Sequence, residues 1–273
     1  MTDTQLLAVN YIDGLLAALG SAADGSFGPE VGVLFSGGVD SCVIAELARR
    51  RSRTTLYTIG VKGSHDMTVA EATAKRFGLE WAGTEVREDD IREAVTGIQA
   101  VLGAIGPLAI SFEMPLYFIA RDSKERSLAN GQGADEMFGG YARYGTMDAR
   151  TRREEMAKDV TNLVSSGSAN ERSLASHFGK TMVHLYLDRR VIDAAAALPD
   201  DLLINDGITK VALREVARSL GLIEEAERRK KAAQYGSGVM RMMRSMAKHD
   251  GMELRDWVRS LDLSHQEGEH AVR

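Results

Sequence analysis

The first half of the chain alternates between short, continuous apolar runs and segments in which apolar side chains recur at helical spacing. The apolar runs are residues 31–35, 54–59 and, more weakly, 79–86, and the helical segments are residues 41–51, 68–77 and 88–102. A further helix is expected over residues 115–124 and a very short strand over residues 127–130. This alternation predicts βαβ units, and therefore an α/β fold with a doubly wound parallel sheet.

The pattern differs on either side of this region. Residues 4–19 have helical spacing, and a loop is expected over residues 21–29. Beyond residue 145 the pattern is helical, without a convincing series of strands; the helical segments are residues 147–163, 189–197, 208–219 and 237–248. We therefore divide the chain into an N-terminal helix and linker (1–24), an α/β core (25–145), a helical region completing the site (146–259) and a polar tail (260–273).

Composition excludes several classes of protein. The 273 residues are 44% hydrophobic and 27% charged, as in an ordinary soluble protein. No apolar stretch approaches the ~20 residues of a membrane span, and the net charge of −5 argues against binding to nucleic-acid backbones. A single cysteine, Cys42, excludes an internal disulfide framework and indicates a reducing compartment, so we expect a cytoplasmic protein.

The first chemical motif, SGGVDS at residues 36–41, lies between the run at 31–35 and its helix. Adjacent glycines let a ligand approach the backbone, and the N-terminus of the following helix offers unpaired N–H groups that suit a phosphate. Asp40 would repel a bare phosphate, but it is explained if it holds a Mg²⁺ ion that bridges to a polyphosphate. For the two glycines alone, a plain turn is the alternative.

The second motif, NGQGADEMFGGY at residues 130–141, contains four glycines and two carboxylates. That density predicts a tightly turned loop. Asp135 is a candidate for a second metal carboxylate, opposite Asp40 across the polyphosphate. For Asp135 and Glu136 alone, the alternative is a helix N-terminus, where negative charge is favourable.

Both motifs resemble those of a known family. SGGVDS is similar to the pyrophosphate-binding loop of the N-type ATP pyrophosphatases, which cleave ATP to AMP and pyrophosphate while adenylating a substrate. The second string resembles the GEGADE(I/V)FGGY signature of asparagine synthetase and its β-lactam-forming relatives. The resemblance covers about residues 25–245 and includes a K-x-x-L-R helix at Lys210 and an R-x-K-x-A-x-x-x-G stretch at 228–236. It implies an adenine nucleotide α-hydrolase-like fold.

The resemblance also implies roles for individual residues. ATP would be contacted by Leu34, Ser36, Gly37, Gly38, Asp40, Ser41, Ile59 and Gly131. Asp40 and Asp135 would bind Mg²⁺. Lys230, with Lys231 a near tie, would stabilise the charge that develops on phosphate and on the reacting carboxyl group; a solvated surface is the alternative for this basic stretch.

The implied reaction is that of an ATP-dependent, amide-forming ligase. A carboxylate, with aspartate the leading candidate, attacks the α-phosphorus of ATP, and ammonia then displaces AMP. Full-length glutamine-dependent members begin with a glutaminase domain whose cysteine follows Met1, and Thr2 stands at that position here. We therefore expect free ammonia, or a separate glutaminase subunit, as the nitrogen source; a homodimer remains open.

Two departures from the family pattern keep other interpretations open. Gln132, a candidate catalytic residue, stands where the family usually has glutamate, and an amide cannot act as a general base. Val183 replaces an arginine, which weakens the case for binding the α-carboxylate of aspartate, although His184 lies beside it. The alternatives are a related ligase acting on a different carboxylate and a non-catalytic nucleotide-binding paralogue.

Overall fold

The computed structural model describes residues 3–228 and 236–261. Its main sheet has five parallel strands in the order β3-β2-β1-β4-β5. The strands are β1 (Glu30–Leu34), β2 (Arg53–Gly60), β3 (Glu80–Glu85), β4 (Ser127–Ala129) and β5 (Thr181–Val183). The chain winds outward from β1 in one direction and returns at β4 to continue in the other. This confirms the predicted doubly wound parallel sheet, and its switch point lies between β1 and β4.

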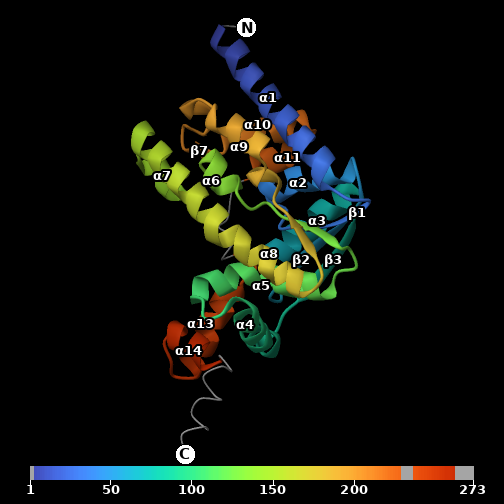
Figure 1. The fold of residues 1–273 in the computed structure, drawn as a ribbon, viewed down its shortest axis with the longest axis vertical. Coiled ribbons are helices and arrows are strands. Elements are labelled where there is room, and N and C mark those ends of the chain that lie inside the picture. The colour runs from blue at the N-terminus through green and yellow to red at the C-terminus, as the bar shows by residue number, and fades with distance from the viewer. Residues whose placement is uncertain (1–2, 229–235, 262–273) are drawn as a thin grey trace, which may run out of the picture.

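Helices cover both faces of the sheet (Figure 1). One face carries α1 (Asp3–Ser26), α2 (Val39–Arg49), α3 (His65–Phe77), α9 (Arg189–Ala196), α10 (Val211–Ser219) and α11 (Ile223–Glu227). The other carries α4 (Glu88–Leu102), α5 (Pro107–Asp122), α8 (Ser168–His177), α13 (Val239–His249) and α14 (Leu254–Ser260). Successive strand residues point to opposite faces, so Val33 and Ala129 enter the first core while Leu34 and Leu128 face the second.

Two further helices follow strand β4: α6 (Ala134–Phe138) and then α7 (Ala149–Asn162). Helix α5 begins at Pro107, in the first helical turn, and includes Pro115. The predicted start at residue 115 was therefore wrong, because a proline is tolerated in the first turn and Pro107 supplies the actual start.

Two further sequence expectations were wrong. Helix α1 runs through Gly20 to Ser26, where a loop was expected, because Leu19, Ala22 and Ala23 are fully buried in the first core. The region beyond residue 145 contributes strand β5 to the main sheet and a two-stranded hairpin, β6 (Ile204–Asn205) and β7 (Ile208–Thr209). Strands of two or three residues are too short to show a period. The division of the chain near residue 145 stays a prediction.

Helix α1 contains a longer apolar segment than the sequence analysis expected. Over Leu6–Ser26 it is the one helix among the described residues that is long and apolar enough to cross a membrane, by length and composition. Helices α4 and α5 pass the same test only as a pair bent by 100°. In the structure, Leu15 and Leu19 of α1 are fully buried in the first core.

Candidate active site

A cavity of about 510 Å³ lies at the switch point of the sheet, where the loops after β1 and β4 meet. Parallel strands direct their carboxyl ends to one edge, and ligands of such folds bind there. Eight of the candidate residues line it: Leu34, Ser36, Asp40, Ser41, Ile59, Gly131, Gln132 and Asp135. Gly37 and Gly38 form the turn beside it and are not among the lining residues. Lys230 and Lys231 lie outside the described residues.

The loop after β1 is shaped to receive an anion. Gly37 has φ +73°, and a Cβ atom there would lie 2.8 Å from Val69 Cγ1, so this turn requires glycine. The backbone N–H of Ser36 donates to Ser41 Oγ at 3.3 Å, and that hydroxyl donates to the Gly38 carbonyl at 3.1 Å. Helix α2 begins after Gly38 without a side-chain cap. Its first N–H groups therefore remain available for a phosphate.

The two candidate metal carboxylates are joined by a buried lysine. Lys210 Nζ lies 2.6 Å from Asp40 Oδ2 and 2.7 Å from Asp135 Oδ1, and Lys210 is 1% exposed. Burial alone would lower the pKa of Lys210, but the two aspartates outweigh it and raise that pKa. Asp40 Oδ1 is buried without a hydrogen-bond partner. Two carboxylates with one unused oxygen fit a Mg²⁺ site, because this ion prefers oxygen ligands.

Close backbone approaches fix this arrangement. A Cβ atom on Gly140 would overlap the side chains of Asp135 and Lys210, and a Cβ atom on Gly131 would lie 3.0 Å from Asp40 Cβ. The hydroxyl group of Tyr186, which is fully buried, donates to the backbone carbonyl of Asp40 at 2.9 Å. The two glycine-rich loops are therefore packed directly on each other.

The opposite half of the cavity is organised around Glu171 of α8. Asn130 Nδ2 donates to both Glu171 carboxylate oxygens at 2.8 Å, and His184 Nε2 lies 2.5 Å from Glu171 Oε2. The amide of Gln132 faces the same carboxylate, and with its nitrogen turned toward Glu171 it donates to both carboxylate oxygens. His184 is thus occupied by Glu171, which favours a structural role over the suggested contact with a substrate carboxylate.

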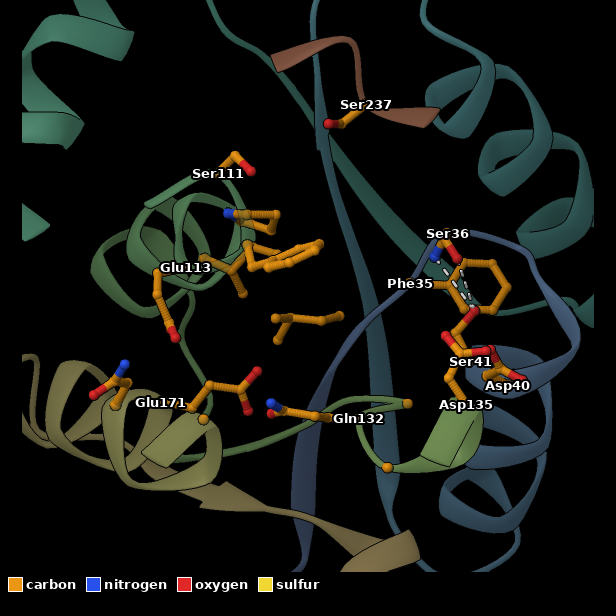
Figure 2. A pocket seen from close by; sticks show the side chains of 18 of the residues that line it. Phe35, Ser36, Asp40, Ser41, Ser111, Glu113, Gln132, Asp135, Glu171 and Ser237 are labelled. Atoms are coloured by element: carbon orange, nitrogen blue, oxygen red, sulfur yellow. Dashed lines mark hydrogen bonds between the residues drawn. The ribbon is translucent and has the colours of Figure 1, made fainter. Parts of the chain in front are cut away.

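Glu113 of α5 lies in this half as well. It is 5% exposed, and its Oε2 atom is buried without a hydrogen-bond partner. Burial, with a smaller contribution from the negative charge of Glu171, raises the pKa of Glu113 to about 8. Figure 2 shows Glu113, Gln132 and Glu171 on one side of the cavity and Ser36, Ser41, Asp40 and Asp135 on the other.

The described lining of the cavity is acidic. Its ionisable carboxyl groups are Asp40, Asp66, Glu113, Asp135, Glu136 and Glu171. None of the described lining residues is a lysine, arginine or histidine. Val183, which replaces the family arginine, is buried in the first core.

The residues on either side of the undescribed stretch 229–235 also lie at this site. Arg228 donates to the carbonyl of Gly37 and, at 3.3 Å, to Thr73 Oγ1. Ser237 lines the cavity, and its carbonyl accepts from the Val61 N–H at 2.9 Å.

Sequence reasoning missed three residues of the site. Lys210 was noted only as part of a helix motif, and its contact with both aspartates depends on a 170-residue separation from Asp40 that no local pattern reveals. Glu113 and Glu171 were not singled out. A usable signal existed for Glu113, because it is the one acidic residue between Pro107 and Arg121 in an otherwise apolar helix.

Known proteins share this sequence pattern. A model of the asparagine synthase family matches residues 26–185 and 184–268. A putative glutamine-hydrolysing asparagine synthetase 1 of Methanocaldococcus jannaschii is 28% identical over 86% of this chain and 50% of its own length. Asparagine synthetase B of Escherichia coli is 24% identical over 76% of this chain and 41% of its own length. The chain thus spans about half the length of these curated relatives.

A solved structure also resembles the chain. The U34-tRNA thiolase NcsA from Methanococcus maripaludis gives a TM-score of 0.43 at 14% identity, covering 92% of this chain and 77% of that one.

Proposed function

This chain belongs to the asparagine synthase family, and from that premise we propose that it adenylates a carboxylate with ATP and transfers ammonia to the acyl group. The observation that carries the proposal is the pair Asp40 and Asp135, held on facing glycine-rich loops beside the uncapped start of α2. An anion-binding helix end next to two fixed carboxylates suits a polyphosphate with its counter-ion.

Some residues of the site would contact ATP itself, and others would hold the ion that neutralises its charge. The N–H groups at the start of α2, with Ser36 and Ser41, would bind the pyrophosphate portion, while Leu34 and Ile59 would lie against the adenosine portion. Asp40 and Asp135 would hold Mg²⁺, which neutralises polyphosphate charge when bound. Lys210 holds both carboxylates in place through its two ion pairs.

The reaction then needs positioning more than covalent participation of the protein. A carboxylate oxygen of the substrate forms a bond to the α-phosphorus, and pyrophosphate leaves. Ammonia next adds to the acyl carbon, loses a proton, and AMP leaves with the original carboxylate oxygen. Lys230 or Lys231 stays our proposal for the group that stabilises charge on the phosphate.

Aspartate is the first acid to test, and the acidic lining gives a specific reason to test others. Binding aspartate requires charge compensation for a second carboxylate, and none of the described lining residues is basic. A related ligase acting on a different carboxylate is therefore the second candidate. A cytoplasmic location, and a separate glutaminase subunit as the source of ammonia, also remain proposals.

The test is pyrophosphate release from Mg-ATP with ammonium and a panel of amino acids and other carboxylates. We expect release that depends on one acid, and a loss of at least about 100-fold in Asp40→Ala and in Asp135→Ala. Asp13→Ala, at an exposed position on α1, is the matched control. Near-normal release by Asp135→Ala would remove Asp135 from the metal site.

Gln132→Glu separates an active enzyme from a degenerate one. If the chain is active as it stands, this substitution should change amide formation only modestly, because an amide at position 132 cannot be the general base of the reaction. A gain on the order of 100-fold or more, the usual contribution of general-base catalysis, would show that the chain has lost its ancestral activity. Amide formation by both proteins with ATP, aspartate and ammonium gives the comparison.

A further inference from the structure

The half of the cavity away from the nucleotide loops contains two carboxyl groups with very different surroundings. Glu171 receives hydrogen bonds from Asn130 and Gln132 and contacts His184. Glu113, on a different helix, has one buried oxygen without any partner, although it is 95% shielded from solvent. A buried polar atom without a partner is costly and uncommon in a folded protein, so a ligand group is the natural partner for Glu113 Oε2.

The charges indicate what kind of group this partner is. An anionic partner for Glu113 is disfavoured by the negative charge of Glu171 and by the lack of basic side chains in the described lining. A metal ion is disfavoured at this pair, because the oxygens of Glu171 are already occupied by Asn130 and His184. A protonated amine needs only a negatively charged, hydrogen-bond-accepting site and supplies several N–H donors.

We propose that Glu113, supported by Glu171, binds the ammonium group of a ligand of this cavity. The ligand is either the acid being adenylated, through its own amino group, or the nitrogen nucleophile, which enters as an ammonium ion. The identity of the ligand rests on the proposed ligase function, whereas the ammonium site itself does not.

Proton balance gives this site a measurable property. The pKa of Glu113 is about 8 in the free protein, so its carboxyl group holds a proton at pH 7. Binding of an ammonium group favours the carboxylate, and the proton of Glu113 passes to solvent. Affinity for a permanently protonated amine should therefore rise with pH up to about 8, by at most tenfold per pH unit, and then level off.

Other titratable groups around α5 have partners of their own. On β2, the hydroxyl group of Tyr57 donates to Glu125 Oε2 at 2.7 Å. On α4, Glu93 pairs with Arg121 at 3.0 Å. Glu171 on α8 is the charged group whose field reaches Glu113. The pH dependence of amine binding can thus be assigned to Glu113, which lies in the field of Glu171.

The direct experiment is calorimetric or NMR titration with methylammonium chloride, without ATP, between pH 6.5 and 9. Alkylammonium ions stay protonated over this range, because their pKa is close to the ~10.4 of lysine. We expect binding by the wild type that strengthens with pH, and binding by Glu113→Gln that is at least about tenfold weaker at pH 9 and independent of pH. Glu93→Gln, on the neighbouring exposed surface of α4, should behave like the wild type.

A second variant distinguishes loss of the carboxyl group from loss of the fold. Glu113→Asp keeps the charge and should retain pH-dependent methylammonium binding, with reduced affinity, and thermal unfolding of each variant confirms that it is folded. Equal, pH-independent binding by wild type and Glu113→Gln would overturn the proposal. Because this titration contains no ATP, its failure is separate from a failure to find ligase activity.

Steady-state kinetics then identifies the source of the ammonium group. A rise in KM for an amino acid, but not for its des-amino analogue such as succinate against aspartate, places the substrate amino group at Glu113. A rise in KM for ammonium, with pyrophosphate release unchanged, places the nucleophile there. Either outcome in Glu113→Gln supports the proposal, and unchanged KM values for both ligands contradict it.

Discussion

The two halves of the cavity each contain a pair of carboxyl groups, and the two pairs differ in the positive charge that surrounds them. Asp40 and Asp135 share a buried cation, Lys210, which lies within 2.7 Å of both. Glu113 and Glu171 are bridged by no lysine or arginine among the described residues; Glu171 contacts His184, and Glu113 retains a proton because of burial. The first pair is thus held by a shared cation before any ligand arrives, whereas Glu113 has no counter-charge until a ligand supplies one.

This difference matches what each half would bind. A polyphosphate arrives as an anion with its own metal ion, so the protein must position carboxylates without letting them repel the ligand. An amine arrives with its charge exposed and needs a negative partner.

Lys210→Met should have the largest effect, because it removes the cation and leaves the first pair as uncompensated as the second. Breaking a buried ion pair by removing one partner typically costs about 3–5 kcal/mol of unfolding free energy. We expect a loss of this size at pH 7 in urea denaturation, together with loss of pyrophosphate release.

Mg²⁺ should restore part of the stability that Lys210→Met loses at pH 7, because the ion supplies a positive charge between the two carboxylates. Lys62→Met, at an exposed position, is the control. A variant as stable as the wild type at pH 7 would show that Lys210 does not neutralise the pair.

Gly140→Ala tests the geometry of the same pair without changing any charge. The added methyl group would overlap Asp135 and Lys210, so one of them must move. Overpacking of this kind costs about 1–3 kcal/mol, and pyrophosphate release should fall by at least about tenfold. Gly145→Ala, which has no atom within 4 Å of the new Cβ, should be close to wild type. Equal activity of the two variants would contradict the tight packing of the loops.

These two variants also show how far the sequence could predict the site. Asp40 and Asp135 stand out because each lies in a dense glycine-rich string after an apolar strand, and strand order brings those strings together. The cation between them was not predictable in this role, because Lys210 is the N-cap residue of α10 and reaches the site from a left-handed backbone conformation, with φ +58°.

The second pair was harder still to predict. Glu113 and Glu171 lie on helices α5 and α8, which meet only because β4 and β5 are neighbours in the sheet. A three-residue strand such as β5 carries no recognisable period, so no sequence pattern placed α8 beside α5. Parallel-sheet topology was predictable from alternating patterns, but the contacts made by its shortest edge strand were not.

Glu113→Gln should flatten the pH dependence of stability. The pKa of Glu113 is about 8 in the folded protein and 4.5 for the ordinary side chain, so folding takes up a proton between these values. Its stabilising contribution is complete below pH 4.5 and is lost as pH rises through 8. The wild type should therefore lose up to about 1.4 kcal/mol per pH unit relative to Glu113→Gln in this range.

Urea denaturation at half-unit pH steps from 5 to 8.5 measures the difference between wild type and Glu113→Gln. Glu93→Gln should run parallel to the wild type. Parallel curves for wild type and Glu113→Gln would mean that Glu113 is ionised in the free protein, which would remove the contrast between the two pairs.

Tyr186→Phe should have the smallest effect, because it perturbs the first pair only through the backbone. The Tyr186 hydroxyl group donates to the Asp40 carbonyl at 2.9 Å, and burial raises the pKa of this hydroxyl well above its usual value, so it remains a donor at every accessible pH. Losing one buried hydrogen bond costs about 1 kcal/mol, and this loss should not vary between pH 6 and 9. The KM for ATP should rise by about twofold to fivefold, since 1 kcal/mol corresponds to a factor of about five in binding.

Tyr11→Phe, on the exposed start of α1, is the control. A fall of more than about 100-fold in pyrophosphate release would instead place the Tyr186 hydroxyl at the reacting atoms, and the charged pair would then not be the main determinant of that half of the cavity.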